Sequence, residues 1–146
     1  MFADFLKRLT QPDPEALPDE DARLALTALL VRIARSDNDY SDREKERIDQ
    51  ITARRYGLGP GATTALRSEA EALEAEAPDT VRFTRAIKDA VPYEERRAVV
   101  QALWQVVLAD GERAKEEDAL VRMVTNFLGV SDRDSALARQ AVDTGT

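Results

Sequence analysis

The stretch Leu24-Ala-Leu-Thr-Ala-Leu-Leu-Val-Arg-Ile-Ala34 decides the fold, because it is apolar around most of the circumference of a helix. A helix of this composition is buried on several sides. A second run of the same character, Ala98–Ala109, lies in the other half of the chain. We therefore predict that Glu20–Ser36 and Ala98–Ala109 form the two central helices of the domain.

Segments with helical periodicity surround these two runs. Amphipathic patterns predict helices over Arg43–Tyr56 and Lys115–Leu128, and a glycine, Gly57 or Gly129, closes each of them. Further helices are predicted for the stripe Phe2, Phe5, Leu6 and Leu9, for Gly61–Ala77, for Thr80–Ala90, and from Ser131 onward. No stretch shows the sustained period-two alternation of a strand. The fold class is therefore all-α, a compact single-domain bundle of about seven to eight helices.

The chain has 146 residues, of which 43% are apolar, enough for one domain with a real core. Its formal net charge of −7 repels phosphate backbones and anionic lipid, so nucleic acid is not an expected partner. A cation or a basic protein surface suits this charge better. The absence of Cys and His leaves oxygen ligands, not thiolate or imidazole, for any metal.

The N-terminal residues differ from the rest of the chain. Residues 1–18 hold a short amphipathic helix and a Pro-rich linker, Gln11–Pro18, and residues 19–146 form the helical domain. We expect the apolar stripe of the first helix to pack on the body, the alternative being an anchor for a membrane or a partner. No secretory leader or membrane span is expected, since no apolar run approaches about 20 residues.

An acidic pattern follows each of the two apolar runs. The first copy reads Ala34-Arg-Ser-Asp-Asn-Asp-Tyr-Ser-Asp-Arg-Glu44, and the second reads Val107-Leu-Ala-Asp-Gly-Glu-Arg-Ala-Lys-Glu-Glu117. One offset of 73 residues relates three acidic pairs: Asp37 with Asp110, Asp39 with Glu112, and Glu44 with Glu117. This repetition indicates an internal duplication and predicts pseudo-two-fold character.

Helix boundaries alone explain part of the acidic pattern. Ser41 and Glu44 match the capping box, in which a hydroxyl and a carboxylate satisfy free N–H groups at a helix start. Asn38 and Gly111 share one repeat position, and both residue types tolerate the left-handed conformation that ends a helix. On this interpretation the acidic residues are solvated and mark helix ends.

Binding of a divalent cation is the other interpretation. The helix macrodipole is negative at a C-terminus, so an anion there is unfavourable. Four carboxylates of the pattern fall at such positions: Asp37, Asp39, Asp110 and Glu112. In the second copy the cap position is Ala114, which has no capping side chain, yet Glu117 is retained. An oxygen-only cluster selects a hard ion, Ca²⁺, Mg²⁺ or Mn²⁺.

Two other chemistries do not fit the pattern. An EF-hand requires Gly at its sixth position and Glu at its twelfth, whereas the first copy has Asp42 and Ile48 and the second has Lys115 and Val121. No phosphate-cradling Gly loop, nucleophile elbow or metal–His constellation is present in the sequence. Catalysis is therefore not expected.

The apolar helix followed by Leu108-Ala-Asp-Gly-Glu112 and an acid at a helix start, repeated twice, resembles the TerB family. The resemblance covers about Asp19 to Val142, and the first copy departs from the pattern at Asn38. This family is named for tellurite resistance and is similar to the N-terminal domain of DjlA-type co-chaperones. The resemblance implies an all-α fold, a divalent metal and membrane-associated stress-response complexes. Its implied metal ligands are Asp37, Asp39, Glu44, Asp110, Glu112 and Glu117.

Two functions are consistent with these features. The first is a non-enzymatic, cation-responsive interaction module, cytoplasmic and peripheral to the inner membrane through protein partners. The second is a metal-independent protein scaffold or co-chaperone-like domain, which uses an apolar groove between helices or the Phe2 and Phe5 stripe. The sequence leaves the oligomeric state open.

Overall fold

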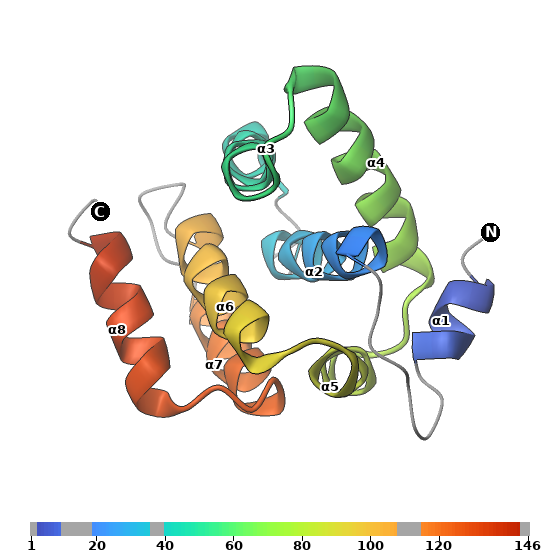
Figure 1. Cartoon of the computed structure of the whole chain (residues 1–146). Helices are drawn as coiled ribbons and strands as arrows, with labels where there is room; N and C mark the ends of the chain where they lie inside the picture. Colours follow the sequence, from blue (N-terminus) through green and yellow to red (C-terminus); the bar gives the residue numbers. More distant parts are fainter. Residues whose placement is uncertain (1–2, 10–18, 36–39, 108–114, 144–146) are drawn as a thin grey trace.

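A computed structural model describes residues 3–9, 19–35, 40–107 and 115–143 of the chain. These residues form helices and no strands (Figure 1). The helices are α1 (Ala3–Leu9), α2 (Asp19–Ala34), α3 (Asp42–Tyr56), α4 (Pro60–Glu76), α5 (Thr80–Ala90), α6 (Tyr93–Val107), α7 (Lys115–Phe127) and α8 (Asp132–Asp143). The all-α prediction is confirmed, and eight helices in the described residues agree with the predicted number. The internal duplication stays a prediction.

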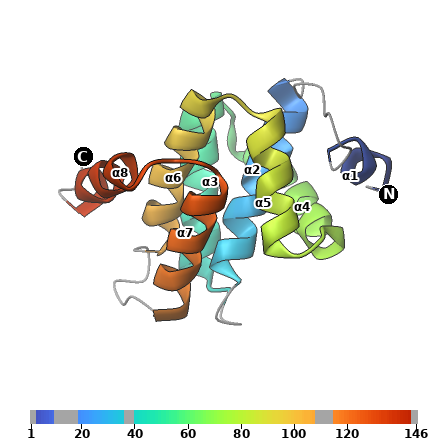
Figure 2. The same cartoon turned by 90° about the horizontal axis from the view of Figure 1, so that it is seen from below.

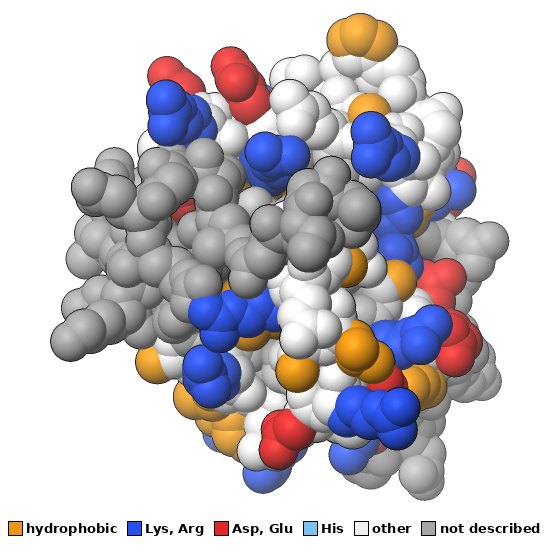
Figure 3. All heavy atoms as spheres, turned by 90° about the vertical axis from the view of Figure 1, so that its left-hand side faces the viewer, with side chains coloured by type: hydrophobic (Ala, Val, Ile, Leu, Met, Phe, Trp, Pro, Cys, Tyr) orange, Lys and Arg blue, Asp and Glu red, His pale blue; other side chains and the backbone are white. Residues whose placement is uncertain are grey.

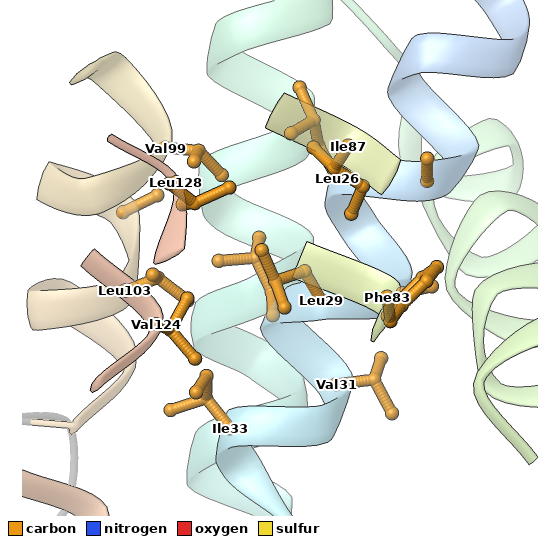
Figure 4. Packing of buried hydrophobic residues seen from close by; sticks show 14 of the residues in the cluster. Leu26, Leu29, Val31, Ile33, Phe83, Ile87, Val99, Leu103, Val124 and Leu128 are labelled. Carbon is orange, nitrogen blue, oxygen red and sulfur yellow. The ribbon is translucent and has the colours of Figure 1, made fainter. Parts of the chain in front are cut away.

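The helix α2 is enclosed by the rest of the bundle. From Leu24 to Ala34 every residue except Arg32 is buried. Helices α3, α4, α5, α6 and α7 all contact α2. Figure 4 shows apolar side chains of α5, α6, α7 and the turn after α7 around those of α2, among them Phe83, Ile87, Val99, Leu103, Val124 and Leu128. The most apolar stretch of the sequence is therefore the centre of the core, as the periodicity predicts.

Four helices are arranged as two antiparallel pairs. Figure 2 shows α2 and α6 running downward and α3 and α7 running back up. The C-terminal ends of α2 and α6 and the N-terminal ends of α3 and α7 therefore lie at the same lower end of the molecule in that view. These are the helix ends that flank residues 36–39 and 108–114 in the sequence.

The helix boundaries follow local chemistry. Gly57 ends α3 with φ of 65°, and Gly129 follows α7 with φ of 71°, so both adopt the left-handed conformation that glycine permits without strain. The second central helix begins at Tyr93, five residues before the apolar run at Ala98. Its first turn is closed by the Pro92 carbonyl, which accepts from the backbone N–H groups at positions 95 and 96.

The short helix α1 packs on the body, as the apolar stripe predicts. Phe5 and Leu9 are buried, and α1 contacts α5. The predicted linker Gln11–Pro18 and the side chain of Phe2 lie outside the described residues. The apolar face of α1 is thus part of the core, which favours packing over the alternative of an anchor.

Candidate metal site

The structure describes only part of the predicted metal-ligand set. Glu44 lies in the first turn of α3 and is described with its side chain. Glu117 lies in the first turn of α7, but its side chain is outside the described residues. The other four members also lie outside them: Asp37, Asp39, Asp110 and Glu112. The described part of the site therefore consists of Glu44 and the helix ends around it.

Ser41 and Glu44 form the capping box that the sequence predicts. The Ser41 hydroxyl oxygen accepts from the Glu44 backbone N–H at 3.2 Å. In return, Glu44 Oε1 accepts from the Ser41 backbone N–H at 3.2 Å and from the Ser41 hydroxyl at 3.2 Å. These bonds satisfy free donors at the start of α3, so Glu44 has a structural role whether or not a cation is bound.

Glu44 is also fully buried, with an exposed fraction of 0%. Removing a carboxylate from water is costly unless hydrogen bonds or opposite charge compensate it. At Glu44 the positive end of the α3 macrodipole and the donors of Ser41 supply part of that compensation. The cap therefore holds the Glu44 carboxyl group at the end of the molecule where α2 and α6 finish.

A chain of side-chain contacts fixes the residue before this cap. The Tyr40 hydroxyl donates to Glu71 of α4 at 2.7 Å. Arg67 of α4 donates to Glu71 at 3.1 Å and to Asp49 of α3 at 2.9 Å. Burial, and then the hydrogen bond to the neighbouring Glu71 carboxylate, raise the pKa of Tyr40 above its ordinary value. These side-chain contacts hold the start of α3 against α4. The position of Tyr40, which directly follows residues 36–39 in the sequence, is therefore fixed.

The other end of that segment is held by arginines. Arg32 near the end of α2 and Arg35 directly after it contact the two oxygens of Glu74 in α4, at 3.1 Å and 2.9 Å. Arg32 also donates to the backbone carbonyls of Glu74 and Pro78, where α4 ends. Cationic groups near a helix C-terminus stabilise its free carbonyls. Both described flanks of residues 36–39 are thus anchored to α4.

Sequence reasoning missed this anchoring. Tyr40 and Glu71 are separated by 31 residues, and Arg35 and Glu74 by 39. No local pattern links residues so far apart in the chain, because periodicity reports only which face of one helix is buried. A pairing of this kind requires α4 to lie beside both α2 and α3, as it does in the structure.

The chemistry of the predicted donors fits a hard divalent cation. All six are carboxylates, and the sequence offers neither His nor Cys as a competing ligand. Within the described part of the chain, no three acidic side chains are grouped so that they could hold a metal ion. The predicted cation site therefore rests on carboxylates of residues 36–39 and 108–114, and Glu44 is the one predicted ligand whose side chain the structure describes.

A family model, that of the tellurite resistance protein TerB, matches residues 23–140. This match spans all of the helices α3 to α7 and most of α2 and α8, and the chain belongs to the TerB family. The resemblance drawn from the acidic pattern is therefore confirmed. Neither the search of curated proteins nor that of solved structures gave a match. Among the described residues, no helix has the length and apolar character that crossing a membrane requires.

Proposed function

We propose that this TerB-family domain is a non-enzymatic module that binds a divalent cation at the end of the bundle where α2 and α6 finish. One observation carries the proposal. The described helix ends that flank both acidic segments lie at this end of the molecule, and buried Glu44 lies there too (Figure 2). The two acidic segments, which are 73 residues apart in the sequence, therefore adjoin helix ends in one region of the fold.

The charge distribution at this end supports a cation. Asp37, Asp39, Asp110 and Glu112 follow two helix C-termini, where the macrodipoles disfavour negative charge by about 0.3–1 kcal/mol each. A cation of charge two would offset that cost and the mutual repulsion of the carboxylates. Carboxylate oxygens are the ligands that Ca²⁺, Mg²⁺ and Mn²⁺ prefer.

In this proposal the protein supplies binding and not catalysis. Glu44 caps the start of α3, Glu117 lies in the first turn of α7, and the described residues on both sides of 36–39 are anchored to α4. Occupancy of the site would bias the packing of the α2–α3 and α6–α7 joints, which a protein partner could sense. We place the domain in cytoplasmic stress-response complexes of the tellurite-resistance type, peripheral to the inner membrane through its partners.

The test is a calorimetric titration of the full chain with Ca²⁺, Mg²⁺ and Mn²⁺, with a thermal melt alongside. We expect saturable binding of at least one ion and a raised melting temperature, because a ligand that prefers the native state stabilises it. The combined substitution Asp110→Asn and Glu117→Gln should weaken binding and leave the helical circular dichroism unchanged.

A matched control removes the same number of charges elsewhere. Glu69 and Asp89 are exposed and form no ion pair within the described residues, so Glu69→Gln with Asp89→Asn should bind the ion as the wild type does. Equal binding by all three proteins would show that the acidic segments are not the site. Absence of binding in the wild type would leave the metal-independent scaffold as the better explanation.

A further inference from the structure

A groove lies between α3 and α6, and its α3 wall is basic. Its volume is about 920 Å³, and alanine side chains of α6 form part of its floor. The polar groups that line it are Arg47, Gln50, Arg54, Arg55, Gln101 and Gln105. Among the described residues that line this groove, none is acidic. In a chain with a net charge of −7, a cavity lined by three arginines and three glutamines is a local reversal of charge.

Two of these arginines have no ionic partner within the described residues. Arg47 and Arg54 are exposed, whereas the neighbouring Arg55 contacts Glu95 of α6 at 3.6 Å. Elsewhere on the surface, the exposed Arg82 and Arg97 have an acid within reach on their own helix or its cap. The exposed Arg122 and Arg133 form no ion pair within the described residues, but they lie outside this groove. Within the described part of the chain, no acidic side chain pairs with these two cationic groups of the groove. Figure 3 shows Lys and Arg side chains spread over the described part of one face of the molecule, with acidic side chains among them.

The spacing of the two arginines defines a ligand length. Arg47 and Arg54 are seven residues apart, so they lie on one face of α3, about 10 Å apart along its axis. Gln101 and Gln105 line the opposite wall one turn apart on α6, which runs antiparallel to α3 (Figure 2). A peptide in the polyproline II conformation has three residues per turn and rises about 3.1 Å per residue, so carboxylates three residues apart lie on one face, about 9 Å apart, and match the arginine spacing.

We propose that this groove binds an acidic segment of a partner protein. The guanidinium groups of Arg47 and Arg54 pair with two carboxylates of the segment, since the planar guanidinium fork matches carboxylate geometry. The amides of Gln101 and Gln105 can both donate and accept, so they can bond to the peptide groups of the same segment. The groove begins about one helical turn from Glu44, and none of its lining residues is among the six predicted metal ligands.

A short acidic peptide fits better than a nucleic acid. A polyanion extends beyond the groove and meets the field of a molecule that carries seven excess negative charges. A peptide with a few carboxylates interacts mainly with groups within the screening length, about 8 Å at physiological salt. Glutamine pairs also match peptide amide groups, which the backbone of a nucleic acid lacks.

The test measures the fluorescence anisotropy of a labelled peptide that repeats Glu-Ala-Ala four times, mixed with the full chain at physiological salt. A peptide that repeats Gln-Ala-Ala is the matched control ligand. We expect the glutamate peptide to bind, the glutamine peptide not to bind, and the double variant Arg47→Glu and Arg54→Glu to weaken binding about tenfold or more. Both substituted residues are exposed, so the variant should keep its helical circular dichroism.

A control variant separates the groove from the overall charge. Arg82→Glu with Arg133→Glu changes the net charge by the same amount at exposed positions outside the groove, and should leave the affinity within about threefold of the wild type. Equal weakening by both double variants would overturn the proposal, as would a wild type that does not bind the glutamate peptide. Tighter binding of a single-stranded oligonucleotide through Arg47 and Arg54 would overturn it too. So would a dimer, detected by sedimentation, that the Arg47 and Arg54 variant disrupts.

Discussion

The two apolar helices α2 and α6 are equivalent in the sequence pattern, but they have different surroundings in the structure. Along α2, from Leu24 to Ala34, only Arg32 is not buried. Along α6, Gln101 and Gln105 remain partly exposed between buried neighbours. Helix α2 is covered by five other helices, whereas α6 contacts α2, α3, α7 and α8. Similar runs therefore produce a core helix in one case and the wall of a groove in the other.

The difference arises from the helices that follow each run. Helix α4 lies beside both α2 and α3 and is tied to α2 by Arg32 and Glu74. Helix α8 packs on α6 instead, where the Trp104 indole N–H donates to the Ser135 hydroxyl at 3.3 Å. The side of α6 that faces α3 lines the groove. The local composition of a helix limits how much of its surface can be buried. The neighbouring helices determine how much of that surface is buried in the structure.

The largest expected effect tests the core side of this comparison. Leu29 of α2 and Leu103 of α6 are both fully buried, so each substitution by Ala should cost about 2–5 kcal/mol of unfolding free energy. On the groove side of α6, Gln105→Ala should stay within about 0.5 kcal/mol. Urea denaturation measures all three. A large cost at Gln105 would show that the groove face is part of the packed core.

The two glycines that end α3 and α7 give the next effect. An alanine in the left-handed conformation costs about 1–2 kcal/mol, which applies to both Gly57→Ala and Gly129→Ala. At Gly57 a Cβ meets no atom within 4 Å, but at Gly129 it comes within 2.9 Å of Lys88 Cε and 3.1 Å of Arg96 Nη1. Arg96 donates to the Leu128 carbonyl, so its displacement should add about 1 kcal/mol at Gly129.

Thermal melts of the two variants measure that contrast. Equal losses would mean that the side chains of Lys88 and Arg96 move aside without cost. Gly57→Asn is the control for the cost of the left-handed backbone conformation, because Asn tolerates that conformation better than Ala.

Tyr40 provides a pH-dependent effect of similar size. Its folded-state pKa is raised by burial and by Glu71, so the contribution of the neutral hydroxyl is fully present below the ordinary Tyr pKa and is lost as pH rises above it. Above about pH 10, the free energy of unfolding of the wild type should fall by about 1.4 kcal/mol per pH unit relative to that of Tyr40→Phe. Urea denaturation of both proteins at pH 9 and pH 11 tests this; a constant difference would contradict it.

The smallest effect concerns helix caps. Ser41→Ala removes a complete capping box and should cost about 1 kcal/mol. Ser131→Ala removes one bond, from the Asp134 backbone N–H at 3.1 Å, on a helix start that is exposed, and should cost less. Ser41→Thr retains both the acceptor and the hydroxyl that donates to Glu44, and serves as the control. A larger loss at Ser131 would show that the reciprocal contact of Glu44 adds little to the cap.

Much of the fold could be predicted from local patterns. The segment Thr80–Ala90 was predicted with the bounds that α5 has, and α3 and α7 begin and end within one residue of their predicted limits. Capping residues and glycines mark helix ends through bonds that join residues close in sequence, so the sequence displays them directly. The acidic pattern likewise led to the TerB family, which the family model confirms.

The candidate site was only partly accessible to the same reasoning. The role of Glu44 in the cap follows from the spacing of two residues, and the structure confirms it. The metal ligands that the family resemblance implies stay a prediction. The anchoring of Tyr40 by Glu71 and of Arg35 by Glu74 was not predicted, because those contacts join different helices.

The sequence by itself determined the helical class, the helix ends and the repeated acidic pattern, because these depend on side-chain spacing and backbone preferences within a few residues. Only the tertiary structure decided that the ends of α2 and α6 lie together and that α2 is enclosed while α6 lines a groove. It also brought Arg47 of α3 beside Gln105 of α6 in one cavity. Such proximities depend on which apolar faces pack against each other, and that choice is made by the whole core at once.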